Sequence, residues 1–179
     1  MRFLTGGKPT PPNEIRDMVL PFMLSYYERF DRLGYWAAEA TATGEFLGWF
    51  HFRPAENGDV ELGYRLRRSA WNKGYAIEGS RALIRMGFTD LAVERVFAQT
   101  MTVNEASRRV MEKSGLMLVR TFYPDSPEAI EGSELGEVEY ALTKSGWEAS
   151  SGAGLVVEGT SDPGPGSRSA SDEGDHVIP

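Results

Sequence analysis

Strand-like alternation of hydrophobic and polar residues is clearest in the segment VELGYRLR, residues 60–67. Hydrophobic side chains occupy every second position from Val60 to Leu66, so they share one face of an extended chain. Two earlier segments, GYWAAEA (34–40) and FLGWFHFRP (46–54), are also strand-like and are joined by TATGE, a hairpin signal. The pattern predicts three consecutive strands that form a meander.

Helical spacing occurs on both sides of this meander. The segment PPNEIRDMVLPFMLSYYERFDRLG predicts a helix from about Pro12, with a kink at Pro21. Its expected inward-facing residues are Ile15, Met18, Met23 and either Tyr26 or Tyr27. A second helix is expected to end at about Phe88, with Ala76, Gly79, Leu83 and Met86 at helical spacing on its inner face.

The rest of the chain returns to strand patterns around one short helix. VERVFAQTM (93–101) predicts a strand, and NEASRRVMEKSG predicts a helix with Asn104 as N-cap and Gly115 at its end. LMLVRTFY (116–123) and VEYALTK (138–144) predict two further strands. The order of elements indicates an α+β or mixed α/β domain built on one twisted sheet.

The C-terminal segment differs in composition from the rest. Residues 148–179 are rich in Gly, Ser and Pro, contain no aromatic residue, and hold six acidic residues against Arg168 alone. Such a segment buries too little apolar surface to offset its ordering entropy, so we expect a folded domain over 1–147 and a disordered acidic tail over 148–179. The tail accounts for −5 of the net charge of −7, which leaves −2 for the domain.

Composition excludes several classes of function. The absence of cysteine rules out disulfides, thiolate metal sites and a cysteine nucleophile, and with His51 and His176 as the only histidines we expect no metal site. No serine lies in the G-x-S-x-G pattern of a serine hydrolase. The net charge of −7 argues against non-specific nucleic-acid binding, although the acidity of the nearly neutral domain is not itself a functional clue. No segment has the length of a signal peptide or of a membrane span, about 20 apolar residues, so a cytoplasmic location is expected.

The turn WNKGYA, residues 71–76, separates the third strand from the long helix. Free backbone N–H groups at a helix start can bind phosphate, and Gly and Asn suit such a turn because they leave the approach open or adopt positive φ. Lys73 adds a charge, and Arg67 and Arg68 lie just upstream. The turn lacks the pattern of a nucleotide-triphosphate loop and of G-x-G-x-x-G. From these residues alone, a plain strand-to-helix connection is an equally good interpretation.

Four motifs in order, ELGYRL (61–66), WNKGYAIE (71–78), VNEAS (103–107) and VMEKSG (110–115), resemble the core of the GNAT superfamily of acetyl-coenzyme A-dependent N-acetyltransferases. The branch containing the ribosomal-protein alanine N-acetyltransferases is the most similar. Trp71 stands where the superfamily has Gln or Arg, as is common in this branch, and Asn72 where the branch often has Gly. Family members carry a strand and a helix before the segment that begins this chain, so both are expected to be missing, with an exposed sheet edge at 34–40.

The resemblance implies an α/β fold with one twisted, mostly antiparallel sheet, a central splayed parallel pair and flanking helices. It also implies acetyl-CoA as cosubstrate, with its arm between the strands at 61–68 and 93–101 and its pyrophosphate at 72–76. The residues it assigns to cofactor binding are Leu66, Arg67, Arg68, Trp71, Asn72, Lys73, Gly74, Tyr75, Ala76, Asn104 and Ser107.

The catalytic residues expected are Glu61, as proton acceptor from the amine, and Ser107, as hydrogen-bond donor to the leaving sulfur. Each has a purely structural alternative: Glu61 as a solvated strand carboxylate, Ser107 bonded to its own helix, and Asn104 as a cap alone. Tyr140 is a secondary donor candidate that is expected to be core. His51 has no partner visible in the sequence and is interpreted as a structural strand histidine. Four aromatic residues could line an acceptor pocket or belong to the core: Trp36, Trp49, Tyr64 and Tyr75.

The function expected from this resemblance is transfer of acetyl from acetyl-CoA to a primary amine by direct attack. The acceptor partner is a protein N-terminus or a small molecule, and no nucleic-acid or membrane partner is expected. The sequence does not decide between a monomer and a homodimer. The alternative function is a catalytically inactive module that binds acetyl-CoA or another protein.

Overall fold

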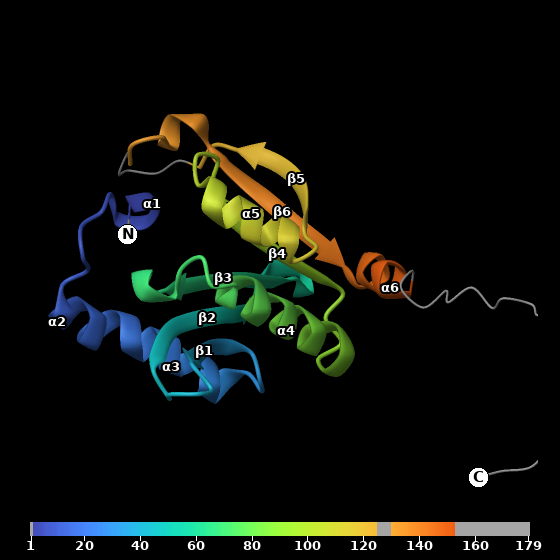
Figure 1. Cartoon of the computed structure of the whole chain (residues 1–179), viewed down its shortest axis with the longest axis horizontal. Helices are drawn as coiled ribbons and strands as arrows, with labels where there is room; N and C mark the ends of the chain where they lie inside the picture. Colours follow the sequence, from blue (N-terminus) through green and yellow to red (C-terminus); the bar gives the residue numbers. More distant parts are fainter. Residues whose placement is uncertain (1, 125–129, 153–179) are drawn as a thin grey trace, which may run out of the picture.

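A single sheet of six strands forms the centre of the protein, as a computed structural model shows for residues 2–124 and 130–152 (Figure 1). The strands are β1 (Gly34–Glu39), β2 (Phe46–Pro54), β3 (Val60–Leu66), β4 (Arg95–Met101), β5 (Met117–Phe122) and β6 (Glu137–Thr143). They lie in the order β1-β2-β3-β4-β6-β5, and every neighbouring pair is antiparallel except β3 and β4. The predicted fold class is confirmed, and β1 is an edge strand as expected.

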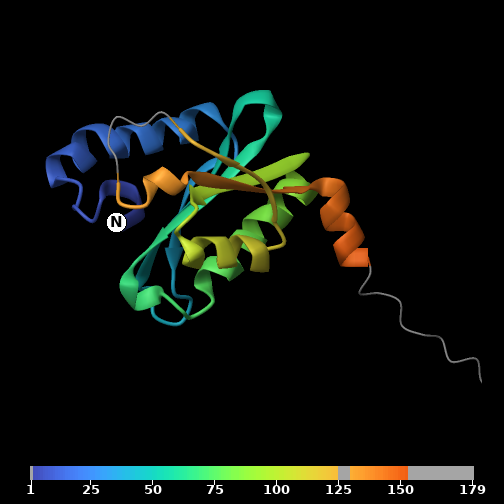
Figure 2. The same cartoon turned by 90° about the horizontal axis from the view of Figure 1, so that it is seen from above.

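Helices cover both faces of this sheet. They are α1 (Arg2–Thr5), α2 (Pro12–Glu14), the π-helix η1 (Ile15–Val19), α3 (Leu20–Arg29), α4 (Tyr75–Asp90), α5 (Glu105–Lys113) and α6 (Lys144–Gly152), with short 3₁₀ turns η2 (Glu56–Gly58), η3 (Arg68–Ala70) and η4 (Ser133–Leu135). Figure 2 shows α3 on one side of the sheet and α4 and α5 on the other. We refer to these sides as the α3 face and the α4/α5 face.

The hydrophobic core lies on the α4/α5 face, between the sheet and these two helices. Its buried side chains are Phe50, Phe52, Val60, Leu62, Leu83, Ile84, Phe88, Val93, Val96, Ala98, Met111, Leu116, Val138, Tyr140 and Leu142. Two helix positions lack a side chain where α4 approaches the sheet most closely. A Cβ at Gly79 would lie 2.3 Å from the ring of Phe50, and one at Gly87 would lie 2.7 Å from the ring of Phe52. Glycine at these positions therefore lets α4 lie close to β2.

The N-terminal helical segment is less regular than its sequence suggested. Pro21 cannot donate a backbone hydrogen bond and its ring would crowd the preceding turn. The chain widens there into η1, where the N–H of Leu20 bonds to the carbonyl of Ile15. The predicted inward positions Ile15 and Met18 are wrong, since these side chains are 46% and 67% exposed. Tyr26 does face the sheet, with its ring 5.6 Å from that of Tyr35.

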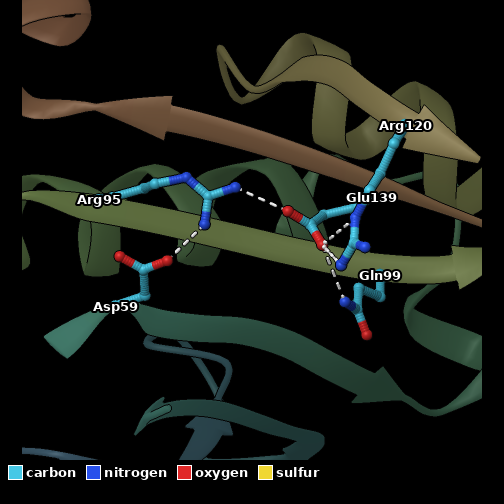
Figure 3. A network of polar contacts seen from close by, with 5 residues as sticks. All are labelled: Asp59, Arg95, Gln99, Arg120 and Glu139. Atoms are coloured by element: carbon cyan, nitrogen blue, oxygen red, sulfur yellow. Dashed lines mark hydrogen bonds and ion pairs between the residues drawn. The ribbon is translucent and has the colours of Figure 1, made fainter. Parts of the chain in front are cut away.

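A buried carboxylate organises the α3 face of β4, β5 and β6 (Figure 3). Glu139 on β6 is only 5% exposed. One carboxylate oxygen lies 2.6 Å from Nη2 of Arg95, and the other lies 2.8 Å from Nη2 of Arg120 and accepts from Gln99 at 3.1 Å. Arg95 also pairs with Asp59 at 2.5 Å, so the network extends to the residue before β3. Because the charges compensate one another, the carboxylate can stay ionised although it is buried.

The C-terminal end of the described chain is helical. Helix α6 extends to Gly152, so the domain end predicted at 147 falls inside a helix. Trp147 explains this, because its ring packs 5.6 Å from that of Phe88 and anchors α6 on the core. Residues 153–179, which hold most of the predicted tail, lie outside the described residues. Among the described residues, no helix combines the length and apolar character needed to cross a membrane.

Candidate active site

The two parallel strands at the centre of the sheet separate along their length. β3 and β4 pair only through Val60 with Val96 and Glu61 with Phe97, yet β3 continues to Leu66 and β4 to Met101. Beyond Glu61 the two strands therefore no longer pair with each other. The backbone of β3 on that side is left available to another extended chain.

The turn that follows β3 presents unpaired backbone N–H groups. Asn72 and Gly74 both adopt positive φ, +58° and +87°. Within the described part of the chain, the N–H groups of residues 72–76 donate no hydrogen bond, whereas those of Ile77 and Glu78 bond back to the carbonyl of Gly74. A Cβ placed on Gly74 would meet nothing within 4 Å. The turn is therefore an open anion-binding geometry at the start of α4.

Positive side chains flank this turn unequally. Arg68 and Lys73 are exposed, and their side chains form no hydrogen bond or ion pair with another described residue. Arg67 instead points to the β1–β2 hairpin, where it pairs with Glu45 at 3.4 Å and donates to the carbonyl of Phe46 at 3.2 Å. The structure thus leaves Arg68 and Lys73, rather than the side chain of Arg67, free to meet an anion.

Trp71 fastens the turn to the end of β3. Its indole Nε1–H donates to the carbonyl of Leu66 at 2.8 Å, and the N–H of Arg67 donates to Leu47 at 2.8 Å. The carbonyl of Leu66 and the N–H of Arg67, both predicted to bind the cofactor, therefore already have hydrogen-bond partners. A cofactor arm that pairs with β3 must use backbone groups before Leu66 or displace the indole of Trp71. Tyr75 and Ala76 open α4 with half-buried side chains.

Across the gap between the strands, the start of α5 brings a hydroxyl next to β3. Asn104 caps α5 as predicted, since its Oδ1 accepts from the N–H of Ser107 at 3.4 Å and its Nδ2 donates to Thr100. The hydroxyl of Ser107 lies 3.1 Å from that of Tyr64. Burial raises the pKa of Tyr64, so its phenol stays protonated and can donate. From the sequence, Tyr64 was only one of four aromatic residues that could line a pocket or belong to the core. The contact between Tyr64 and Ser107 was not predicted.

Glu61 lies on the opposite face of β3, as the alternation predicted. Nη2 and Nε of Arg53 lie 2.6 Å and 2.8 Å from its Oε2. Burial opposes the charge on Glu61, but the adjacent His51 and Arg53 outweigh it and hold the pKa of Glu61 below its usual value. Glu61 is thus a half-buried, ionised carboxylate at the point where β3 and β4 begin to part.

No partner for His51 is visible in the sequence, and the structure places a carboxylate near its imidazole. Its Nε2 lies 3.6 Å from Oε1 of Glu61. The register of β2 and β3 causes this, since His51 pairs with Gly63 and Arg53 pairs with Glu61. His51 and Glu61 lie on consecutive strands joined by a short connection, and this spacing in the sequence was the signal that could have predicted their contact.

The remaining aromatic candidates are mostly structural. Trp49 packs against Tyr35 at 5.5 Å, beneath the guanidinium of Arg65 at 5.2 Å. Tyr140 is buried in the core, accepts from Arg108 and donates to Glu112, so it is not free to act as a donor. Trp36 is a partly exposed residue of the edge strand.

A cavity of about 410 Å³ lies away from these residues, between α4, α5 and α6. Arg81, Arg85, Ser114 and Trp147 line part of it. None of the predicted site residues contributes to its wall, so the cavity does not bear on the site at the central strands.

A parallel pair that separates along its length, followed by an open anion-binding turn at a helix start, is the arrangement expected from the four sequence motifs. The family model described as an acetyltransferase (GNAT) domain matches residues 1–117. The chain belongs to the GNAT acetyltransferase superfamily.

Individual relatives agree with this placement. The FsC-acetyl coenzyme A-N(2)-transacetylase of Aspergillus fumigatus is 32% identical over 156 residues, which cover 82% of this chain and 65% of that protein. Two solved structures have a TM-score of 0.64. The ribosomal-protein-S5-alanine acetyltransferase from Vibrio fischeri is 15% identical and covers 80% of this chain and 81% of its own. The spermidine N-acetyltransferase from Vibrio cholerae, in complex with CoA and spermine, is 13% identical and covers 77% and 80%.

At these identities the two solved structures show a shared fold. The chain spans 65% of the length of the Aspergillus relative and 52% of that of a Bacillus subtilis relative.

Proposed function

We propose that the protein is an N-acetyltransferase that moves an acetyl group from acetyl-CoA to a primary amine by direct attack. The observation that carries this proposal is the arrangement of the site on two faces of β3. The anion turn, Asn104 and Ser107 lie toward the α4/α5 face, and Glu61 lies toward the α3 face. Groups suited to hold the thioester and to accept a proton thus flank the gap between β3 and β4.

The residues present fit the diphosphate of coenzyme A. The N–H groups of residues 72–76 are unpaired and lie at the start of α4, where the positive end of the helix dipole attracts an anion. The exposed Lys73 and Arg68 add charge, and the open space at Gly74 leaves room for phosphate oxygens. The cofactor arm would follow the unpaired edge of β3 toward Glu61.

Ser107 is proposed to stabilise the leaving sulfur. A hydroxyl is a weak acid compared with a thiol, whose pKa is about 8.5, so a hydrogen bond to the thiolate is its expected contribution. The hydroxyl of Tyr64 at 3.1 Å orients that of Ser107. Asn104 holds the start of α5 in place and offers an amide next to the arm.

Glu61 is proposed to accept a proton from the acceptor ammonium, directly or through water. An amine attacks only as the neutral base, and ammonium groups have pKa values of about 8–10. Despite the burial of Glu61, His51 and Arg53 hold its pKa below the usual value, so the carboxylate is an anionic proton acceptor and an attractive site for a cation.

The acceptor is proposed at the level of a primary amine. The fold neighbours are named for a protein alanine terminus and for spermidine, and the Aspergillus relative for an N(2) transfer. The motif resemblance to the ribosomal-protein alanine branch slightly favours a protein N-terminus.

Calorimetric titration with CoA, combined with thiol release from acetyl-CoA on a panel of amines, tests the proposal. CoA binding with thiol release from at least one amine is expected. Binding without release from any amine would favour an inactive module, and no CoA binding would contradict the assignment of the turn.

The variant Glu61→Gln tests the role of the carboxylate. Loss of the proton acceptor should lower kcat by about 100-fold, most strongly below the pKa of the amine, while CoA affinity is unchanged. Glu94→Gln, an exposed carboxylate outside the site, is the matched control and should behave as wild type. An unchanged pH–rate profile in Glu61→Gln would exclude Glu61 as the base.

A further inference from the structure

The imidazole of His51 lies in a place that β3 keeps clear for it. Gly63 is directly opposite His51 in the β2–β3 register, and a Cβ on Gly63 would lie 2.4 Å from both Cε1 and Nε2 of the ring. The rings of Tyr35 and Trp49 stand 5.8 Å and 6.0 Å from it. The His51 side chain is 15% exposed. Packing therefore holds the imidazole in one position on the α3 face.

The buried nitrogen of this ring has no hydrogen bond. Nε2 of His51 is shielded from solvent and has no hydrogen-bond partner among the described residues. A buried polar atom without a partner costs free energy, and such an atom in a folded protein calls for an explanation. Oε1 of Glu61 lies 3.6 Å from it, a distance at which an ion pair forms once the ring is protonated.

The two oxygens of Glu61 have different surroundings. Oε2 receives both contacts from Arg53, at 2.6 Å and 2.8 Å. Oε1 makes no hydrogen bond with another described residue and lies 3.6 Å from Nε2 of His51. One oxygen is therefore fixed by the guanidinium, and the other is free to take up a proton and lies next to a nitrogen that can receive it.

A carboxylate that is held ionised is a poor final acceptor for a proton from an ammonium group. Burial opposes the charge on Glu61, but His51 and Arg53 both favour its charged form, so a proton on this carboxylate is readily given up. Imidazole has an unperturbed pKa of about 6.5 and holds a proton much better than a carboxylate does. The pair together can retain a proton that Glu61 alone would return to the amine.

We propose that His51 is a positioning residue that holds the proton which Glu61 takes from the acceptor amine. This inference rests on the proposed acetyl transfer. One N–H bond of the ammonium breaks, Oε1 of Glu61 carries the proton, and an Nε2–H bond forms on His51. The neutral amine then attacks the thioester carbonyl carbon, the C–S bond breaks, and the second amine proton leaves to the departing sulfur. His51 returns its proton to water after the product dissociates.

The charged groups around His51 decide how readily the ring is protonated. On its own strand the nearest one is Arg53, which is already paired with Glu61. From β3 it faces Glu61, with Arg65 stacked over Trp49, and from β1 it faces the phenol of Tyr35. Glu61 is the one carboxylate among these groups, so it is the group that can form an ion pair with a protonated His51.

The first experiment uses the pH dependence of kcat/KM with a primary amine that the wild-type chain acetylates. Wild type should show a rising limb that depends on the imidazole of His51. His51→Gln should lose that limb and lower kcat about 10-fold at pH 7, with CoA affinity and melting temperature unchanged. His176→Gln removes the other histidine and should keep the wild-type profile.

A second variant covers the case in which His51→Gln folds poorly. Gly63→Ala keeps the imidazole but pushes it away from Glu61, because the added Cβ would occupy the place of the ring. It should lose the same limb while its CoA affinity stays at the wild-type level. A wild-type pH profile in both His51→Gln and Gly63→Ala would overturn the proposal.

Direct titration gives a readout that does not depend on turnover. In the His176→Gln background, His51 is the single imidazole, so its NMR signal is unambiguous. Adding Glu61→Gln should move the midpoint of that titration to lower pH, because the carboxylate that stabilises the imidazolium is gone. Identical midpoints would overturn the pairing. Absence of thiol release from wild type with every amine would instead contradict the proposed acetyl transfer.

Discussion

At the scale of single residues, Gly74 shows how one position serves two requirements. Its φ of +87° ends the turn in a conformation that costs an L-residue about 1 kcal/mol. A side chain there would meet no protein atom within 4 Å, so it would project into the space above the free N–H groups. Substitutions at this position should therefore separate ligand binding from folding.

Gly74→Glu should weaken CoA binding by more than 100-fold, because its carboxylate would cover the amides and repel phosphate. Gly74→Ala is the control, since it carries the same backbone strain without the charge, and it should lose about 1 kcal/mol of stability with a small effect on affinity. Calorimetric titration and urea unfolding of both variants measure the two effects. Wild-type CoA affinity in Gly74→Glu would remove the turn from the site.

At the scale of elements, the contact of α4 with β2 depends on a missing side chain. Alanine is normally about 1 kcal/mol more favourable than glycine inside a helix. At Gly79 the added Cβ would lie 2.3 Å from the ring of Phe50, a clash with a buried aromatic.

Gly79→Ala should therefore destabilise the protein by about 1–2 kcal/mol in spite of its better helix propensity. In a Phe50→Leu background the clash is relieved, so the same substitution should cost less, and a double-mutant cycle in urea measures the difference. Equal costs in both backgrounds would mean that the ring of Phe50 does not limit this helix.

The carboxylate network is a second element-scale device, because it ties β4, β5 and β6 together through one side chain. Burial opposes the charge on Glu139, but Arg120, Arg95 and Gln99 outweigh it and lower its pKa. A lowered pKa in the folded state adds stability that is fully present above the unfolded value of about 4.3. This stability is lost as the pH falls through the folded-state pKa.

Glu139→Gln should lower the free energy of unfolding by about 3 kcal/mol at pH 7, and the difference from wild type should shrink at about pH 3. Glu105→Gln breaks an exposed pair with Arg109 and should change stability by no more than about 0.5 kcal/mol. Urea unfolding at the two pH values is the measurement. A difference that does not vary with pH would mean that the charge of Glu139 contributes little.

At the scale of the whole molecule, the sequence predicted the fold better than the contacts within the site. Alternation in 60–67 and the spacing of helical residues up to Phe88 are local patterns, so each could be placed from its own segment. The pairs Tyr64–Ser107 and His51–Glu61 depend on tertiary packing and strand register, which no local pattern records.

Two failures have physical causes of the same kind. Residues 18–24, MVLPFML, are apolar at every position, so their hydrophobic period could not show which face meets the sheet, and the widened turn η1 shifts that face further. The last helix, α6, is rich in Ser and Gly and has low helix propensity. A tertiary contact of Trp147 with Phe88 stabilises it, and this contact could not be predicted locally.

Trp147 should therefore decide where the domain ends. Trp147→Ala should lower stability by about 3 kcal/mol, the usual cost of removing a large aromatic from a packed site, whereas a chain shortened to residue 152 should melt like the full chain. Thermal melting of both compares the two effects. Wild-type melting of Trp147→Ala would show that α6 adds nothing to the core.

The hydrogen bond from Trp71 to Leu66 gives the protein a built-in optical reporter. The indole is 53% exposed, is held in one orientation, and stands at the entrance of the turn that is proposed to bind the cofactor. A ligand that pairs with the end of β3 has to compete for the carbonyl of Leu66, which would release the indole into a different solvent environment. Occupancy could then be followed by intrinsic fluorescence, and Trp71→Phe would silence the signal while the three other tryptophans remain.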